Sequence, residues 1–99
     1  MDKTKDGLKQ FMRLCHECKD NNMLSEIFDL FFTHEERDNL ALRYLIIRAL
    51  IKQEKSQRDM AEHLNVSIAK ITRGSNELKR MSKKLLQFLK ENIESPTKN

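Results

Sequence analysis

Two cysteines, three histidines and a pair of glutamates are the residues of this 99-residue chain most often seen in metal sites or catalysis. Cys15 and Cys18 form a Cys-His-Glu-Cys motif. A zinc site needs a second pair of ligands, and a redox pair usually opens a helix after a strand, whereas this motif lies inside a helical pattern. Two thiols at this spacing are more often small packing groups on an inner helix face. Packing is therefore the preferred interpretation, with a metal or redox role as the alternative.

The chain contains no convincing arrangement for catalysis. Glu35 and Glu36 are adjacent rather than facing one another, and a helix cap explains Glu36. Ser67 and Ser75 have no histidine base in register, and there is no glycine-rich phosphate loop. We therefore expect a protein that is not an enzyme and has neither a metal nor a catalytic cofactor.

The stretch from Ser56 to Arg80 is typical of a DNA-binding helix-turn-helix. Ser56 and Ser67 can each cap the start of a helix. Asn65, between them, tolerates the left-handed conformation that ends a helix.

The pattern Gln-x-x-x-Ala-x-x-Leu-x-Val-Ser-x-x-x-Ile-x-Arg runs through this stretch from Gln57 to Arg73. Ala61 is small where two helices must cross, and Val66 is apolar at the corner. A pair of helices this short cannot bury its own apolar face, so the rest of the chain must supply a core.

The charge distribution agrees with a nucleic-acid partner. Residues 1–51 hold eight Lys/Arg and nine Asp/Glu, a net of −1, whereas residues 52–90 hold ten and four, a net of +6. Lysine-rich helical faces are often simply solvated. Because the basic half coincides with the predicted DNA reader, neutralisation of DNA phosphates is the better account.

With one Pro and two Gly in the chain, an all-helical fold is expected. Apolar periodicity predicts a helix over residues 4–20, stopped by the Asn-Asn pair at 21–22, and a second over 23–32 capped by Asn22 or Ser25. Thr33 and Glu36 form a capping box that opens a long helix over 33–52. Ser82 caps a last helix over 83–93, and residues 95–99 read as a frayed tail. The fold class is therefore all-α, with six helices.

The long helix is apolar on more than one side, and Phe31 and Phe32 precede it. A 99-residue monomer would struggle to cover so much apolar surface, which predicts an intertwined homodimer. We expect one domain over residues 1–99, with the helix-turn-helix at about 56–80 and a dimer core at about 4–52 and 82–93. No apolar run reaches the length of a membrane span, and the start has no signal pattern, so a cytoplasmic protein is expected.

The run Thr-Arg-Gly-Ser-Asn at positions 72–76 resembles the signature of the tryptophan (Trp) repressor family. Leu-x-x-Thr-x-x-Glu-Arg from Leu30 to Arg37, Arg43 and Ser-Gln-Arg at 56–58 fit the same pattern, without gaps from about Leu30 to Lys79. The resemblance implies a repressor that binds L-tryptophan as corepressor and then represses genes of tryptophan biosynthesis or uptake at a palindromic operator in double-stranded DNA.

The resemblance also implies two sets of site residues. Arg43 and Arg73 would sandwich the indole, and Arg73 would pair with the ligand carboxylate. The corepressor set is Leu30, Phe32, Thr33, Arg43, Arg73, Gly74 and Glu77. The DNA-binding set is Gln57, Arg58, Ser67, Ile68, Ala69, Lys70, Thr72 and Lys79.

Lys70 and Glu77 depart from the family pattern, where threonine and serine are common. Glu77 would either pair with the ligand ammonium or lie against Lys70 or Arg73. Two other functions stay open: a helix-turn-helix regulator without tryptophan dependence, and a basic helical module that binds an acidic protein.

Overall fold

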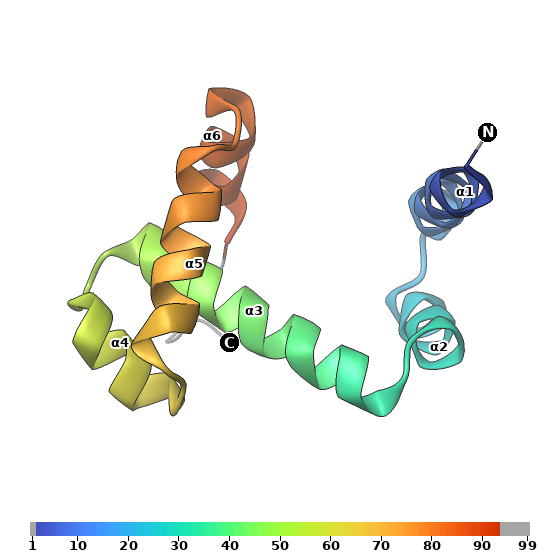
Figure 1. Cartoon of the computed structure of the whole chain (residues 1–99). Helices are drawn as coiled ribbons and strands as arrows, with labels where there is room; N and C mark the ends of the chain where they lie inside the picture. The colour runs from blue at the N-terminus through green and yellow to red at the C-terminus, as the bar shows by residue number, and fades with distance from the viewer. Residues whose placement is uncertain (1, 94–99) are drawn as a thin grey trace. The chain divides into compact units, whose positions relative to one another are not determined.

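The computed structural model describes residues 2–93, and within them the chain folds into six helices and no strands (Figure 1). The all-α prediction is thereby confirmed. The predicted tail at 95–99 lies outside the described residues. The helices are α1 (Lys3–Glu17), α2 (Asn21–Phe31), α3 (His34–Lys52), α4 (Gln57–Leu64), α5 (Ile68–Lys79) and α6 (Lys83–Asn92).

Contacts group the chain into two compact units, residues 1–38 and 39–99, with the boundary inside the continuous helix α3. The first unit contains α1, α2 and the start of α3. The second contains the rest of α3 and the three helices that follow. A single domain over the whole chain stays a prediction.

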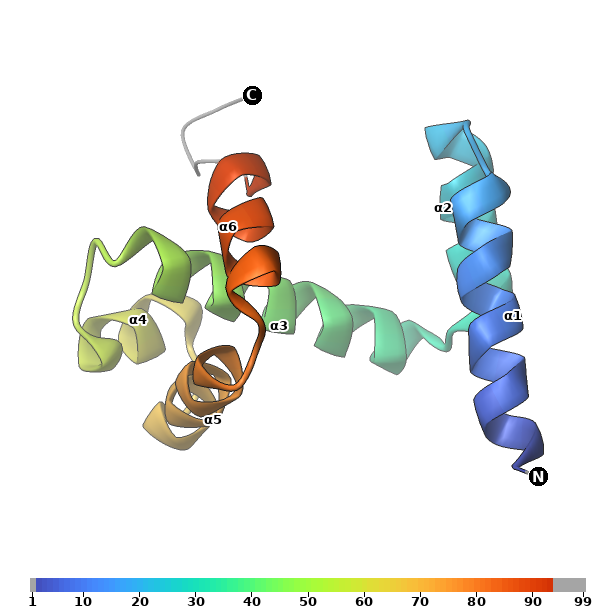
Figure 2. The same cartoon turned by 90° about the horizontal axis from the view of Figure 1, so that it is seen from above.

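An aromatic cluster joins α1 to α2 in the first unit. Phe11 of α1 has its ring centroid 6.1 Å from that of Phe28, 5.1 Å from that of Phe31 and 5.7 Å from that of Phe32. Figures 1 and 2 show the two helices side by side. Because tilted and edge-on aromatic pairs are favourable beyond their buried area, Phe11 is the main link between α1 and α2.

The predicted boundary between α1 and α2 was wrong. Residues 21–22 begin α2 instead of stopping α1, and the cap is Asp20, whose carboxylate accepts a hydrogen bond from the Asn22 N–H at 2.9 Å. Helix α1 ends earlier, at Glu17, where Cys18 turns into an extended conformation. An aspartate carboxylate is a strong acceptor for the free N–H groups of a first helical turn, which explains why Asp20 takes the cap in place of Asn22 or Ser25.

The predicted capping box at the start of α3 is confirmed. The Glu36 N–H donates to the Thr33 hydroxyl at 3.1 Å, and the Thr33 N–H donates to the Glu36 carboxylate at 2.8 Å. An ion pair between Asp29 and Arg37 adds a second link across this corner. Together they fix how the chain passes from α2 into α3.

The core of the second unit lies where α4 and α5 pack on α3. Its buried members are Ile46 of α3, Met60 and Ala61 of α4, and Ile71 of α5, which is completely buried. Val66, in the turn, packs against this cluster. The expected roles of Ala61 at the helix crossing and of the apolar corner are thus confirmed.

Helix α4, a tight turn and α5 follow one another as the sequence indicates; we call them the α4–α5 pair. The hydroxyl of Ser56 accepts from the Asp59 N–H at 3.1 Å, and that of Ser67 accepts from the Lys70 N–H at 3.3 Å. Asn65 has φ 56° and ψ 49°, the left-handed conformation expected at the end of α4. All three local predictions are confirmed.

The left-handed residue gives a test of this turn. Replacing Asn65 by alanine should lower the free energy of unfolding by about 1 kcal/mol, because a Cβ without a local hydrogen-bonding group is strained at positive φ. Asn65→Gly should be as stable as the unchanged chain or more so. Urea unfolding at one fixed protein concentration, followed by circular dichroism, measures both.

Asn76→Ala is the matched control, since Asn76 is exposed inside α5 and alanine favours a helix. It should not lose stability. If Asn65→Ala were as stable as the unchanged chain, the conformation of the turn described above would be wrong.

Candidate functional site

The residues predicted to bind DNA are all exposed and gather on the α4–α5 pair. Gln57 and Arg58 lie in the first turn of α4. Ser67 is the cap of α5, residues 68–72 form its first turns, and Lys79 is its last residue. The cap and first turn of α5 present free N–H groups and the positive end of the helix dipole, both of which favour a phosphate.

Two of these residues bond to each other. The Thr72 hydroxyl donates a hydrogen bond to the Gln57 side-chain oxygen at 3.2 Å, which joins the start of α4 to the middle of α5. This hydrogen bond helps to hold α4 and α5 together. Both side chains are also exposed, so they remain accessible to DNA. Sequence reasoning treated them as separate contacts.

The cations of this surface are largely uncompensated. Among residues 2–93 the structure has two ion pairs, Asp29–Arg37 and Glu77–Arg80. Arg58, Lys70 and Lys79 are therefore free to neutralise phosphates, which is the main source of affinity in DNA binding.

Arg43 and Arg73 lie near the contact of α3 with α5, and both are exposed. Arg43 precedes Ile46 and Ile47 by one helical turn, and these isoleucines contact the position of Gly74. Arg73 is the immediate neighbour of Gly74 in sequence. Neither guanidinium has an ion pair within the described residues.

Gly74 has a packing explanation of its own. A Cβ at this position would lie 3.1 Å from Ile46 Cγ2 and 3.2 Å from Leu50 Cδ1. The missing side chain therefore allows α5 to approach α3 closely. Sequence reasoning explains a glycine here by the close approach of a ligand or of another backbone and places it in the ligand pocket; the close helix contact accounts for it without a ligand.

The other predicted corepressor residues, Leu30, Phe32 and Thr33, belong to the first unit. The last carbonyl groups of α2 have no N–H partners within the helix and form its negative end. The capping box uses the Thr33 N–H, which is therefore not available to these carbonyls. They remain suitable acceptors for an ammonium group.

Glu77 pairs with Arg80, whose Nη1 lies 3.1 Å from the Glu77 carboxylate. Lys70 and Arg73 form no ion pair with Glu77 in the described residues. Both partners of the Glu77–Arg80 pair are largely exposed, so it contributes little stability and can be exchanged for another cation.

Cys15 and Cys18 are free, half-buried thiols, and Cys18 Sγ donates to the Asp20 carbonyl at 3.3 Å. Within residues 2–93, no three histidine, cysteine, aspartate or glutamate side chains gather as a metal site would require. The preferred packing role is compatible with this arrangement.

Comparison with known proteins decides the family. The sequence matches the family described as Trp repressor protein over residues 6–93. The chain belongs to the Trp repressor family. It is 44% identical over 87 residues to a Trp operon repressor homolog of Chlamydia trachomatis serovar D, covering 88% of this chain and 93% of that protein. A Trp operon repressor homolog of Chlamydia caviae is 42% identical over 85 residues, covering 86% and 84%, and one of Haemophilus influenzae is 35% identical over 89 residues, covering 90% and 88%.

Membership of the Trp repressor family implies DNA-binding transcriptional repression, so the protein is a regulator and not an enzyme. The family in general uses tryptophan as its corepressor. None of the helices in the described part of the chain is long and apolar enough to span a membrane.

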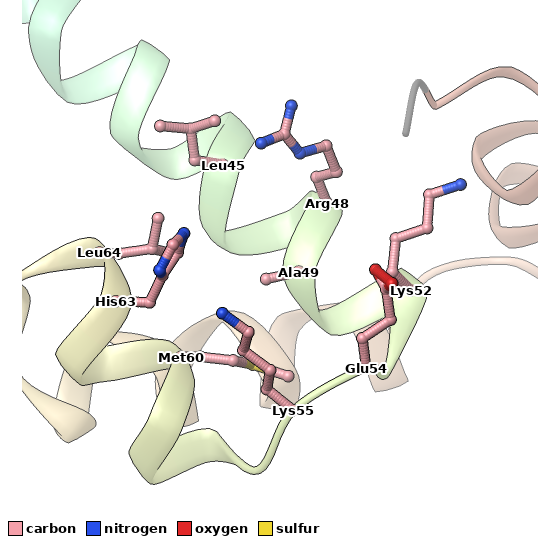
Figure 3. Close-up of a pocket in the computed structure, with 9 residues that line it drawn as sticks. All are labelled: Leu45, Arg48, Ala49, Lys52, Glu54, Lys55, Met60, His63 and Leu64. Carbon is pink, nitrogen blue, oxygen red and sulfur yellow. The ribbon is translucent and has the colours of Figure 1, made fainter. Parts of the chain in front are cut away.

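Sequence reasoning missed features of this repressor that depend on tertiary packing. The Gln57–Thr72 hydrogen bond joins residues fifteen positions apart, and the Asp29–Arg37 pair spans eight. A small cavity between α3 and α4 was missed as well, because its apolar lining reads as core (Figure 3). One pattern in the sequence could have indicated this cavity: the basic residues Arg48, Lys52 and Lys55 are interspersed among the apolar residues that line it.

Whether Gly74→Ala raises or lowers the stability of the ligand-free protein distinguishes the packing explanation of this glycine from the ligand explanation. If close packing requires the glycine, Gly74→Ala should destabilise the ligand-free protein by about 1 kcal/mol, because overpacking outweighs the gain in helix propensity. If only a ligand required it, the same change should stabilise the ligand-free protein. Thermal unfolding without tryptophan measures the difference.

Gly7→Ala in α1 is the control, because a Cβ there would meet no atom within 4 Å. It should raise stability by up to about 1 kcal/mol. A stabilised Gly74→Ala variant would contradict the packing explanation.

Proposed function

We propose that this Trp repressor family member binds L-tryptophan and that the bound ligand raises its affinity for a palindromic operator. The observation that carries the proposal is the placement of Arg43 and Arg73. Both are exposed near the contact of α3 with α5, and neither is engaged in an ion pair within residues 2–93.

The chemistry of tryptophan suits these residues. A guanidinium plane stacks well on an indole, and it stays charged at any physiological pH. Arg73 also provides paired N–H donors for the ligand carboxylate. The ligand ammonium would lie against the last carbonyls of α2, near Leu30 and Phe32, with Thr33 beside it. Glu77 is a second acceptor for the ammonium if its pair with Arg80 opens.

Helix α5 would then connect ligand binding to DNA binding. Its first turns carry the candidate DNA contacts Ser67, Ile68, Ala69, Lys70 and Thr72, while Arg73, Gly74 and Glu77 follow directly. Gln57, Arg58 and Lys79 complete the DNA surface. A ligand held between α3 and α5 would fix the tilt of α5, so that two copies fit successive major grooves. This is a shift of population toward the arrangement that binds both ligand and DNA best.

Operator binding with and without L-tryptophan is the decisive experiment. Filter binding on tryptophan-operon DNA should show at least about tenfold tighter binding with the ligand, the size of a typical allosteric coupling. Arg73→Ala should abolish this response while keeping the fold and part of the nonspecific DNA affinity. Calorimetry measures the binding of tryptophan directly.

Lys84→Ala is the control, because Lys84 is an exposed cation of α6 that neither the proposed pocket nor the proposed DNA surface uses. It should keep the tryptophan response. Salt-sensitive operator binding that ignores tryptophan would indicate a regulator without this corepressor. No salt-sensitive DNA binding at all would favour a protein-interaction module.

We also propose that the repressor is a homodimer, because apolar side chains outside the small core are strongly exposed. Leu30 is 79% exposed, Met12 61% and Phe88 58%. They lie on α2, α1 and α6, the helices assigned to the dimer core from sequence. Exposed apolar surface of this extent on several helices is typical of an interface.

Sedimentation at micromolar concentration should therefore give twice the mass of one chain. Phe88→Ala should weaken the dimer by about 2 kcal/mol or more, because large aromatic side chains dominate the energy of interfaces. Lys83→Ala on the same helix should sediment like the unchanged protein. A monomer at micromolar concentration would contradict the homodimer.

A further inference from the structure

A cavity on the second unit, whose lining does not include Arg43 or Arg73, has the features of a separate ligand site. It has a volume of about 90 Å³ and lies between α3 and α4 (Figure 3). Its apolar lining comes from Leu45 and Ala49 of α3 and from Met60 and Leu64 of α4. None of the residues predicted to bind tryptophan or DNA contributes to it.

The opening of the cavity is basic. Arg48, Lys52 and Lys55 line it, with His63 on the opposite helix, and Glu54 is the one carboxylate among the lining residues. Within residues 2–93, neither Glu54 nor any of the three cations takes part in an ion pair. Arg48, Lys52, Lys55 and Glu54 together give the opening a net charge of about +2, which favours an anion.

Lys55 is the cation placed so that one small molecule could contact both a positive charge and the apolar lining. In Figure 3, the Lys55 ammonium is turned toward the space between α3 and α4, whereas the charged ends of Arg48 and Lys52 point away from that space. The Arg48 guanidinium lies 6.0 Å from the centre of the ring of Tyr44, a residue that does not line the cavity.

We propose that this cavity binds a short, branched aliphatic carboxylate. The hydrocarbon body would lie on Ala49, Met60 and Leu64, and the carboxylate would accept a hydrogen bond from the Lys55 ammonium. A polyphosphate or nucleic-acid phosphate would leave the apolar lining uncovered, and drug-sized ligands need about 300 Å³ or more. The cavity is smaller than the cavity of about 150 Å³ that holds benzene, so the hydrocarbon body must be short.

A ligand in this cavity would affect the DNA surface through the core of the second unit. Met60 belongs to the buried core that holds α4 and α5 on α3, and Leu64 and Ala49 pack against that core. A molecule in the cavity would contact α3 and α4 together and so change how firmly the α4–α5 pair is held. It would act separately from a ligand at Arg43 and Arg73.

The test is an amide NMR titration of the full chain with isovalerate, in the absence of tryptophan and DNA. Saturable shifts are expected in residues 45–52 of α3 and 60–64 of α4. The neutral isostere isovaleramide should bind at least about tenfold more weakly, because it cannot form the charge-assisted bond. Acetate, which lacks the branched body, should also bind more weakly.

Variants make the test specific to this cavity. Lys55→Gln should weaken isovalerate binding by about tenfold, since one charged hydrogen bond is lost. Lys84→Gln, an exposed lysine of α6 outside the cavity, should leave it unchanged. Arg73→Ala should also leave it unchanged, which keeps this site distinct from the proposed tryptophan pocket.

Three outcomes would overturn the proposal: no saturable shifts at tens of millimolar isovalerate, equal binding of isovaleramide, or equal weakening by Lys84→Gln and Lys55→Gln. Shifts at these residues that appear only with an acidic peptide would also overturn it, in favour of a protein partner. None of these results would affect the tryptophan response tested above.

Discussion

The second unit depends on the contact of α5 with α3. Ile71 is completely buried and Ile46 is 5% exposed, and Gly74 brings the two helices close enough for side chains of α3 to touch the α5 backbone. Burying an isoleucine side chain contributes about 1.5–3 kcal/mol relative to leaving it exposed. Met60 and Ala61 of α4 complete the buried cluster, so the α4–α5 pair is held on α3 by these four buried side chains together.

The geometry of a helix lets α5 serve several purposes within a few residues. Successive residues turn by about 100°, so Ile71 points into the core, while Thr72 and Arg73 are exposed in different directions. Thr72 bonds to Gln57 of α4, and Arg73 stands beside the close contact at Gly74. A change in the tilt of α5 would therefore affect the core, the proposed ligand site and the proposed DNA surface together.

The features that could be predicted from sequence are those with local causes. The caps at Ser56 and Ser67 and the left-handed Asn65 depend on a few neighbouring residues, and each appears where the pattern places it. The boundary at Asp20 was missed because asparagine pairs favour both turns and helix caps. Three other features depend on how separate helices meet, which the periodicity of the sequence does not specify. They are the Gln57–Thr72 hydrogen bond, the packing role of Gly74 and the cavity beside Ala49.

The small core gives a physical reason why a ligand could control DNA binding in this protein. The buried cluster that holds α4 and α5 consists of Ile46, Met60, Ala61 and Ile71, with partly buried side chains around it. Elements held by few buried contacts open and shift at low free-energy cost. The proposed ligand would add one stacked ring and one charged pair between α3 and α5, and would thereby favour one position of α5.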